Sequence, residues 1–537
     1  MQNLRKNYWW IILLIFLFHL INNYIILSLD KTLPAYDELG HFLQAFHSLN
    51  FFRDLKEGFS LKRIMDWYHN LGGRTRPPLY ALTLLFPLAV FQKNIINNID
   101  LLILIVNSFY LMILLISIYG IGRKIGDELI GILSAFIVSV FPGIFSMSRV
   151  IMVDFPLTAI VSLSVYSMLL TENFTRRNQS FLLGIFLGLG MLTKATYPIF
   201  ILPLLGYYFV FAIIKTSQGD KKIFKIMINF IISLLVAFFL SSSWYLPNLD
   251  KITQRSKAMS FQLYTGSSKN FISYLTSLIF WGILDIKPFF IAVLYLLGLI
   301  SLFYFKKEKG IPLVIWTIIP SLFFSFSPNQ QLRFLLPILP SIGLTIALIT
   351  SLLKWQTIKK TFICFIVIFS LYFFFVVSYG RIKLMSKDKD FFYSHNRVHK
   401  GIVYPLQSID WKIKDIGEII FSNIKRKPRE ILFVFNMEEI RNGVFLYLLN
   451  KNINATFDCP AQNDFFDSPS IDEYEDLSKF DFIITKDGYQ GTNAGNINWI
   501  EILTERMQKY KDYFFLVGSV KGLPDSSTVY VYKNILY

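Results

Sequence analysis

The 537-residue sequence predicts an α-helical protein that crosses a membrane many times and carries a small α/β domain at its C-terminal end. Hydrophobic residues make up 54% of the chain, and its 54 Phe and 28 Tyr exceed what a soluble core of this size would use. Many of these residues form runs of roughly 20, the length that a helix needs to cross a bilayer. From about residue 381 the apolar runs become short, as in a soluble domain.

Polar connectors divide the apolar sequence into about eleven predicted membrane-spanning helices. Their ranges are 8–29, 100–121, 128–147, 155–171, 180–196, 197–214, 223–244, 286–305, 311–327, 333–353 and 361–379. The first run lacks a small-x-small cleavage site and is longer than the apolar part of a signal peptide, so we interpret it as an uncleaved helix.

Basic residues between the runs predict the orientation, because short connectors rich in Lys and Arg stay in the cytoplasm. With the N-terminus in the cytoplasm, all of the basic clusters fall inside. These clusters are Arg5/Lys6, Arg123/Lys124, Arg176/Arg177, Lys215 with Lys221/Lys222/Lys225, Lys306/Lys307/Lys309 and Lys354/Lys359/Lys360. The same alternation predicts that residues 30–99 and everything after residue 380 lie outside the cell membrane.

The first outer segment, residues 30–99, contains a further apolar stretch from Pro77 to about Phe91. Counting this stretch as a span would reverse the side of every later connector. We therefore predict that it lies on the outer membrane surface or dips into it. Residues 1–380 then form one transmembrane domain, with surface helices in the outer loop.

Residues 381–537 predict an extracytoplasmic α/β domain. The segments 431–435, 482–484 and 529–532 are typical of short buried strands, and residues 438–450 predict an amphipathic helix between them. No motif in this domain identifies a ligand.

Charge and cysteine content exclude two classes of protein. The net charge is +17, but the basic residues lie in the connectors rather than along one face, so we predict membrane lipids and no nucleic acid as partners. Cys364 and Cys459 are the only cysteines in the sequence, which excludes a disulfide framework and a thiolate metal site.

Charged residues predicted on the outer side form the candidate site. The acids are Asp37, Glu38 and Asp154, and the bases are Arg76, Arg149, Lys194 and Arg333. A carboxylate can accept a proton from an alcohol, and guanidinium or ammonium groups can hold a phosphate and stabilise its charge as it leaves. Together they predict group transfer from a lipid phosphate to an acceptor.

Structural explanations fit several of these residues as well. Acids favour helix N-termini, so Asp37, Glu38 and Asp154 also fit helix starts. Arg149 and Arg333 fit interfacial side chains that reach from the membrane to water. Lys194 fits neither explanation, because a charge at membrane depth costs about 2.5–3.5 kcal/mol and the outer side does not favour cations. An anionic partner for Lys194 is therefore expected.

We predict no obligatory metal or other cofactor, because Arg and Lys alone can hold a monophosphate. His41 lies one helical turn after Asp37 and is the one histidine placed to share a metal ion with it. The role of a divalent ion is left open at this point.

Several short motifs occur in a recognisable order on the outer side. They are the Asp37-Glu38 pair, Arg76-Pro77-Pro78-Leu79-Tyr80, Arg149-x4-Asp154-x-Pro156-Leu157, Gly188-Leu-x-Met-Leu-Thr-Lys194, Trp244-Tyr-Leu-Pro-Asn248 and Arg333-Phe-Leu-Leu-Pro337. On these motifs, residues 8–380 resemble the GT-C integral-membrane glycosyltransferases, in the branch of the protein O-mannosyltransferases and the lipid A aminoarabinose transferase.

This resemblance implies transfer of one hexose or pentose from a polyprenyl-phosphate donor to a glycan, lipid or protein acceptor in the cell envelope. By position, Asp37 is similar to the family's catalytic base and Asp154 to its second acid, while Lys194 and Arg333 match positions near the donor phosphate. Arg76 stands where the family usually has lysine, which keeps the charge but changes the geometry. The other hypotheses are a flippase for a lipid-linked sugar and a non-catalytic assembly protein that binds envelope glycan.

Overall fold

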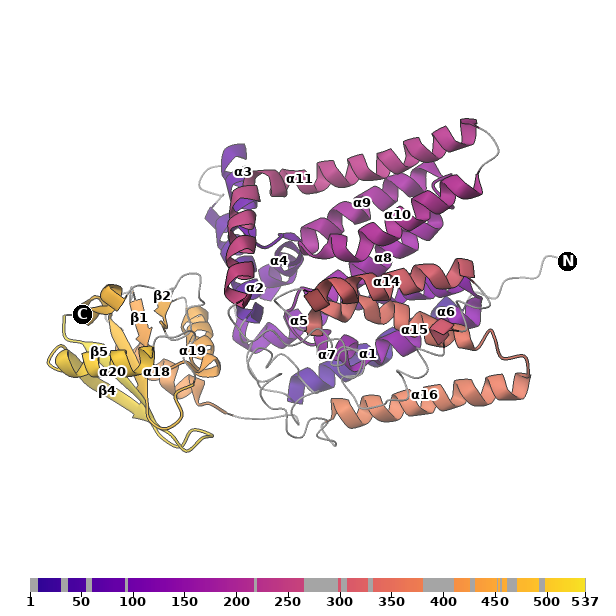
Figure 1. The fold of residues 1–537 in the computed structure, drawn as a ribbon. Coiled ribbons are helices and arrows are strands. Elements are labelled where there is room, and N and C mark those ends of the chain that lie inside the picture. The colour runs from indigo at the N-terminus through magenta and orange to yellow at the C-terminus, as the bar shows by residue number, and fades with distance from the viewer. Residues whose placement is uncertain are drawn as a thin grey trace. The chain divides into compact units, whose positions relative to one another are not determined.

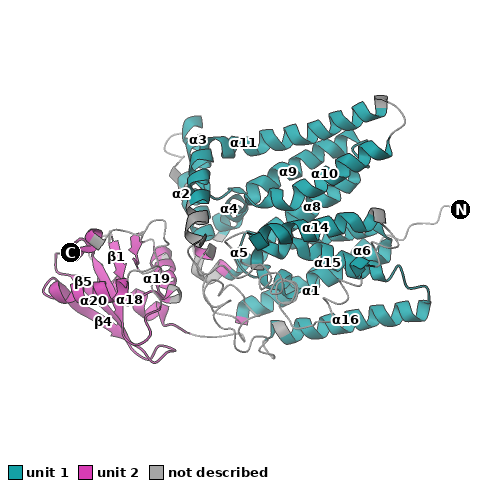
Figure 2. Ribbon diagram, in the orientation of Figure 1, with its two compact units in different colours: residues 1–28, 40–90, 100–406 teal, residues 29–39, 91–99, 407–537 magenta. Residues whose placement is uncertain are grey.

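The structure of the protein is a computed structural model. It describes residues 8–29, 37–54, 60–91, 95–216, 220–264, 298–300, 307–326, 332–379, 410–424, 430–451, 453, 456–460, 471–491 and 498–536. The chain divides into two compact units (Figure 2). Unit 1 comprises residues 1–28, 40–90 and 100–406, and unit 2 comprises residues 29–39, 91–99 and 407–537.

Unit 1 is helical, and its long helices run side by side (Figure 1). Its helices are α1 (Trp9–Leu29), α2 (Asp37–Asp54, which begins in unit 2), α3 (Leu61–Asn70), α4 (Leu79–Phe91), α5 (Ile95–Ile125), α6 (Glu128–Ser139), α7 (Pro142–Met147), α8 (Asp154–Leu170), α9 (Arg177–Thr193), α10 (Tyr197–Lys215), α11 (Asp220–Tyr264), α14 (Lys307–Phe326), α15 (Leu339–Ile349) and α16 (Gln356–Ser378). The 3-10 turns η2 (Leu71–Arg74) and η5 (Leu332–Ile338) precede α4 and α15.

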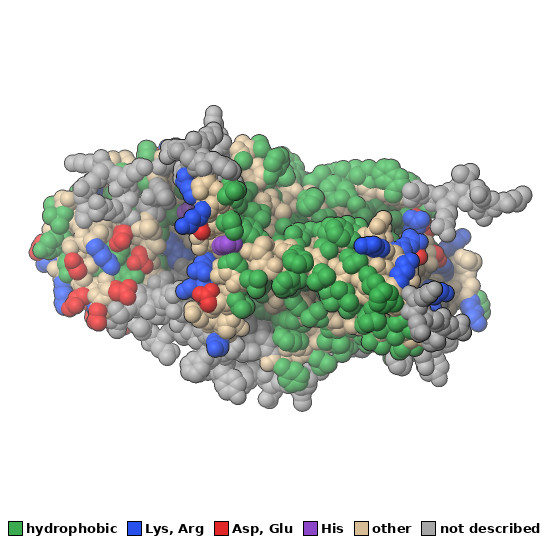
Figure 3. All heavy atoms as spheres, turned by 90° about the horizontal axis from the view of Figure 1, so that it is seen from above, with side chains coloured by type: hydrophobic (Ala, Val, Ile, Leu, Met, Phe, Trp, Pro, Cys, Tyr) green, Lys and Arg blue, Asp and Glu red, His purple; other side chains and the backbone are tan. Residues whose placement is uncertain are grey.

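The surface of unit 1 is that of a multi-pass membrane protein. Within the described residues, six helices are long and apolar enough to cross a bilayer, namely α1, α5, α10, α11, α14 and α16. Large apolar side chains are exposed on them, among them Ile214, Phe239 and Ile368 at 68–70%. Figure 3 shows a broad apolar surface with Lys and Arg gathered toward its ends. Lipid tails, rather than water, suit such a surface.

Most predicted spans agree with observed helices to within a few residues. Three described spans differ, namely 128–147, 333–353 and 223–244. Residues 128–147 form two helices because Pro142 begins a new one, α7. Residues 333–338 form the 3-10 turn η5 before α15 starts at Leu339. The predicted span 286–305 lies outside the described residues except for 298–300.

The third difference is α11, which continues to Tyr264 although its predicted span ends at residue 244. Hydrogen bonds join the beginning of this extension to residues 69–74, which precede α4. Arg74 donates from Nε to Asn248 Oδ1 (2.9 Å) and from Nη2 to the Pro247 carbonyl (2.9 Å), and Asn248 Nδ2 donates to the His69 carbonyl (2.8 Å). Gly72 and Gly73, at φ of 72° and 59°, supply the tight turn that brings Arg74 there.

Unit 2 contains the predicted α/β domain, built on one five-stranded sheet. Its elements are α18 (Ile413–Ser422), β1 (Glu430–Phe433), α19 (Glu438–Asn450), β2 (Thr456–Asp458), the 3-10 turns η6 (Ile471–Tyr474) and η7 (Leu477–Lys479), β3 (Phe482–Lys486), α20 (Trp499–Lys509), β4 (Phe514–Val520) and β5 (Val529–Asn534). The strand order is β2-β1-β3-β5-β4, and β1 runs parallel to both β2 and β3. The three predicted strands and the helix 438–450 are confirmed, whereas β2 and β4 were not predicted.

The segments that follow β1 and β3 are locked together. The Asn436 amide donates to the Gln490 carbonyl (2.8 Å), and Gly491 pairs with Asn436 in an isolated bridge. A Cβ atom at Gly491 would lie 1.9 Å from the Asn436 carbonyl oxygen, so glycine is required for this approach.

Candidate functional site

Asp154 and Lys194, 40 positions apart in sequence, form an ion pair in unit 1. Asp154 is the first residue of α8, and Lys194 follows the last residue of α9 in an extended conformation that turns its side chain out of the helix. Lys194 Nζ lies 2.6 Å from Asp154 Oδ1. The Asp154 side chain is 1% exposed and its Oδ2 atom has no hydrogen-bond partner, whereas Lys194 is 19% exposed. The lysine is therefore the accessible member of the pair.

A second predicted cation, Arg333, meets Lys194 at the ring of Phe334. Lys194 Nζ lies 4.4 Å from the ring centroid and Arg333 Cζ lies 5.6 Å from it, both within cation–π range. Arg333 Nη1 also lies 3.6 Å from the sulfur of Met152, two residues before Asp154. The structure therefore gathers Asp154, Lys194 and Arg333, contributed by α8, the end of α9 and η5. We call these three residues the Phe334 cluster.

Arg76 lies against the first part of α2. A Cβ atom at Gly40 would come 3.0 Å from Arg76 Nη1, so the absence of a side chain at Gly40 makes room for the guanidinium. Gly40 follows Asp37, the first residue of α2, by three positions. The Asp37 side chain lies outside the described residues, and its role as a base stays a prediction.

The remaining candidates of α2 are buried. Glu38 is 4% exposed, and His41 is 7% exposed with its ring packed edge-on against Tyr80 at 5.6 Å. His41 therefore contributes to the packing between α2 and α4.

Arg149 makes its contacts with other residues than those of the Phe334 cluster. Its side chain is fully buried, Nε donates to Asn23 Oδ1 (2.8 Å) on α1, and Nη2 donates to Ser378 Oγ (3.1 Å) at the end of α16. The predicted contact between Arg149 and a donor phosphate stays a prediction.

Two asparagines that we did not single out from the sequence organise this region. Asn107 Nδ2 donates to the carbonyls of Ser148 (3.1 Å) and Val150 (2.7 Å), and Asn23 Nδ2 donates to Ser148 Oγ (2.9 Å). Both hold the segment that leads to Asp154. The sequence did contain a signal for them. Each is an amide side chain inside an apolar span, and a polar group there seldom occurs without a polar partner.

In the part of the chain that the structure describes, no group of three His, Cys, Asp or Glu side chains is arranged to hold a metal ion. The charges of the Phe334 cluster come from one carboxylate and two cations, a set suited to an anion rather than to a cation. Participation of a divalent ion stays an open prediction.

Residues 75–245 match a family described as dolichyl-phosphate-mannose-protein mannosyltransferase. No curated protein sequence matches the chain. Two crystal structures of ArnT from Cupriavidus metallidurans, in the apo state and bound to undecaprenyl phosphate, match with TM-scores of 0.56 and 0.57. Each is 11% identical, and each match covers 97% of both chains. The fold is of the GT-C type.

The predicted resemblance to the GT-C glycosyltransferases is thus confirmed for the fold, over almost the whole chain. An oligosaccharyltransferase from Archaeoglobus fulgidus, in complex with Zn and sulfate, matches at 10% identity with a TM-score of 0.46, over 87% of this chain and 67% of that one. A likeness of that degree carries no information about metal use in this chain.

Proposed function

We propose that the protein is a glycosyltransferase that moves one sugar from a polyprenyl-phosphate donor to an acceptor at the outer face of the membrane. The observation that carries the proposal is the convergence of Lys194 and Arg333 on Phe334, beside Asp154. Two cations at the ends of membrane helices suit a lipid phosphate. The family match at residues 75–245 supports a lipid-linked sugar as donor, and the undecaprenyl phosphate in the similar ArnT structure supports a polyprenyl carrier.

In the proposed reaction, the acceptor hydroxyl oxygen attacks the anomeric carbon of the sugar while the bond between that carbon and the phosphate oxygen breaks. The electron pair of the broken bond leaves with the phosphate, and the hydroxyl proton passes to the Asp37 carboxylate. Lys194, Arg333 and Arg76 stabilise the growing charge on the phosphate. One displacement inverts the anomeric configuration.

Asp154 and Glu38 have supporting roles in this proposal. Asp154 holds Lys194 in place at 2.6 Å, so that the ammonium group faces the donor without having to be ordered on binding. Glu38 neighbours the base in sequence and is buried, which suits a residue that fixes the start of α2.

Mass spectrometry of envelope lipids, glycans and proteins from cells with and without the protein tests the function and identifies the product. Asp37→Asn tests the base, because the change removes proton acceptance while almost keeping shape. We expect turnover to fall by about 10² to 10⁴ while donor binding persists. Asp66→Asn, which changes an exposed acid on α3, is the matched control. Turnover within a few-fold of the parent would remove Asp37 from the mechanism.

A further inference from the structure

Arg149 is a buried cation surrounded by the protein's own helices. Besides its hydrogen bonds to Asn23 and Ser378, its Cζ lies 4.8 Å from the ring centroid of Phe145 on α7 and 5.8 Å from that of Phe374 on α16. These contacts join α1, α7 and α16 through one side chain.

If Arg149 served only to fill space between the helices, an apolar side chain would do so at a lower cost in free energy. Taking a cation out of water is expensive, and a buried charge is often replaceable by an apolar side chain of similar volume without loss. Arg149 Nη1 is buried without a hydrogen-bond partner, and so is Nε2 of His19 on α1. The charge at residue 149 therefore needs an explanation beyond filling space.

The explanation lies in the segment that carries Arg149. Residues 148–153 connect α7 to α8 and are not helical. The amides of Ser148 and Arg149 still donate to carbonyls of α7, but the segment has no continuous helical ladder to fix its path. Asn107 binds two carbonyls of this segment, at Ser148 and Val150. Arg149 ties the same segment to α1 and α16, and Asn23 adds a bond to Ser148. The segment ends at Asp154.

We propose that Arg149 is a positioning residue. It fixes the segment 148–153 between α1 and α16, so that Asp154 keeps its 2.6 Å contact with Lys194. In this role it does not touch the donor phosphate, which differs from the contact expected from the sequence. The catalytic meaning of the inference depends on the proposed function, whereas its structural content does not.

Two small changes test the anchor without removing the charge. Ser378→Ala and Asn23→Ala each delete a partner of Arg149, and Ser164→Ala is the control because Ser164 is also a fully buried, hydrogen-bonded serine of unit 1. With the full chain in lipid nanodiscs, we expect backbone amides of residues 148–154 to exchange about tenfold faster in the first two variants than in the control, as for loss of a hydrogen bond to a charged group. Equal exchange in all three variants would overturn the proposal.

Arg149→Lys separates positioning from phosphate binding, because lysine keeps the charge but lacks the planar fork. We expect Arg149→Lys, Asn23→Ala and Ser378→Ala to raise the donor KM and weaken undecaprenyl phosphate binding to a similar extent, by about 3- to 10-fold, because each acts through the position of Lys194. Weaker undecaprenyl phosphate binding by Arg149→Lys alone, with Asn23→Ala and Ser378→Ala like the control, would make Arg149 a phosphate ligand and overturn the proposal. A parent protein that neither transfers sugar nor binds undecaprenyl phosphate would refute the proposed function, and hydrogen exchange would still decide the anchor.

Discussion

Lys194 makes two electrostatic contacts, one with a carboxylate and one with an aromatic ring. The carboxylate of Asp154 holds the ammonium group at 2.6 Å, and the face of Phe334 holds it at 4.4 Å. The side chain nevertheless keeps 19% of its surface exposed. A lysine restrained in this way is ordered before an anion arrives, which lowers the entropy cost of binding.

The first residue-scale prediction concerns donor binding. Lys194→Ala and Arg333→Ala should each raise the donor KM by about tenfold or more, because each removes a charge-assisted hydrogen bond worth about 1.5–3 kcal/mol. Lys360→Ala, at the exposed start of α16, is the control for loss of a cation. A donor titration in which all three variants match the parent would exclude the phosphate role of both residues.

The second residue-scale prediction concerns the buried ion pair of unit 2. The Lys486 side chain has no exposed surface, and its Nζ donates to Asp525 Oδ2 (2.5 Å). Burial opposes ionisation of Asp525, but hydrogen bonds from Lys486 and Ser527 outweigh it, so the pKa of Asp525 lies below its ordinary value. A carboxyl of this kind stabilises the fold above its unfolded pKa of about 3.9, and that contribution is lost as the pH falls through the lower folded pKa.

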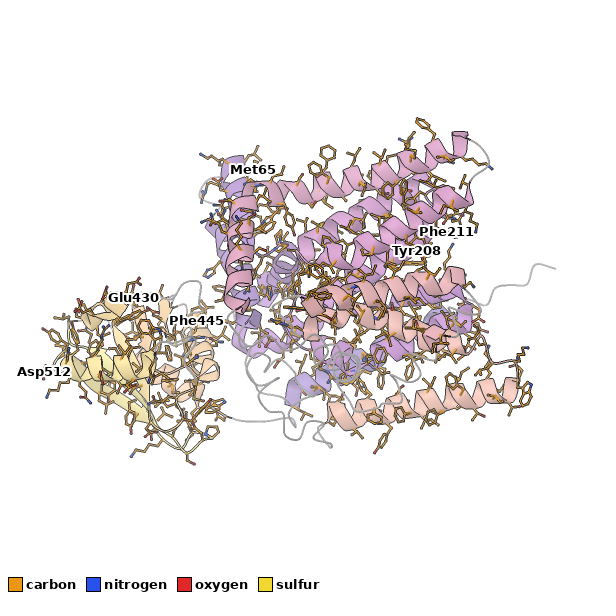
Figure 4. All side chains as sticks on the ribbon, in the orientation of Figure 1. Met65, Tyr208, Phe211, Glu430, Phe445 and Asp512 are labelled. Carbon is orange, nitrogen blue, oxygen red and sulfur yellow. The ribbon has the colours of Figure 1, made fainter. Side chains whose placement is uncertain are left out.

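We therefore expect the hydrogen-exchange protection factors of β3 and β5, in which the intrinsic pH dependence of exchange is divided out, to fall as the pH drops below about 4. Asp525→Asn should remove this pH dependence and cost about 3 kcal/mol of stability at neutral pH, because it leaves Lys486 buried without its carboxylate. Asp512→Asn changes an exposed acid of the same unit, labelled in Figure 4, and should leave both quantities unchanged. A pH profile of Asp525→Asn identical to that of the parent would exclude this role for the pair.

At the scale of elements, α3 has an apolar arc that the protein covers only in part. The arc consists of Leu61, Ile64, Met65, Trp67 and Tyr68. The Tyr68 hydroxyl lies 3.3 Å from the Ser243 hydroxyl of α11, whereas Leu61 and Met65 remain 71% and 57% exposed. Met65 is labelled in Figure 4. A helix of this kind beside the end of a membrane span fits the boundary between headgroups and lipid tails.

The expected depth of α3 is measurable with spin labels. In a Cys364→Ser/Cys459→Ser background, a label at Met65→Cys in nanodiscs should be more accessible to oxygen than to a polar nickel reagent. The label at Asp66→Cys, one position on and at the polar arc, should show the opposite preference. If both labels favoured the nickel reagent, α3 would lie in water.

The sequence predicted the membrane helices well because each depends on one local quantity, the length of an apolar run. The break at Pro142 comes from a local residue that run length alone overlooks. The extension of α11 beyond residue 244 depends on contacts with a distant segment, including Arg74 with Asn248. The candidate site shows the same contrast between what a local pattern predicts and what depends on distant contacts. Lys194 and Arg333 were placed on one side of the membrane by topology, but the separate destination of Arg149, five positions before Asp154, results from the non-helical segment 148–153.

At the scale of the whole molecule, the predicted orientation is open to direct test. Reporter fusions should place Lys359 in the cytoplasm and a fusion after Tyr537 outside, because every basic connector then lies inside. Fusion at Lys124 provides a second inside marker. A C-terminus in the cytoplasm would contradict the alternation of spans and put unit 2 on the wrong side for an extracytoplasmic domain.

The two cations at Phe334 also bear on how turnover would be limited. A polyprenyl-phosphate sugar is a phosphodiester with one negative charge, whereas the lipid phosphate left after transfer carries up to two. Because Coulomb attraction grows with charge, Lys194 and Arg333 should hold the spent carrier more tightly than the fresh donor. We therefore expect product inhibition, in which the rate of sugar transfer in the cell depends on how fast the used carrier lipid is removed.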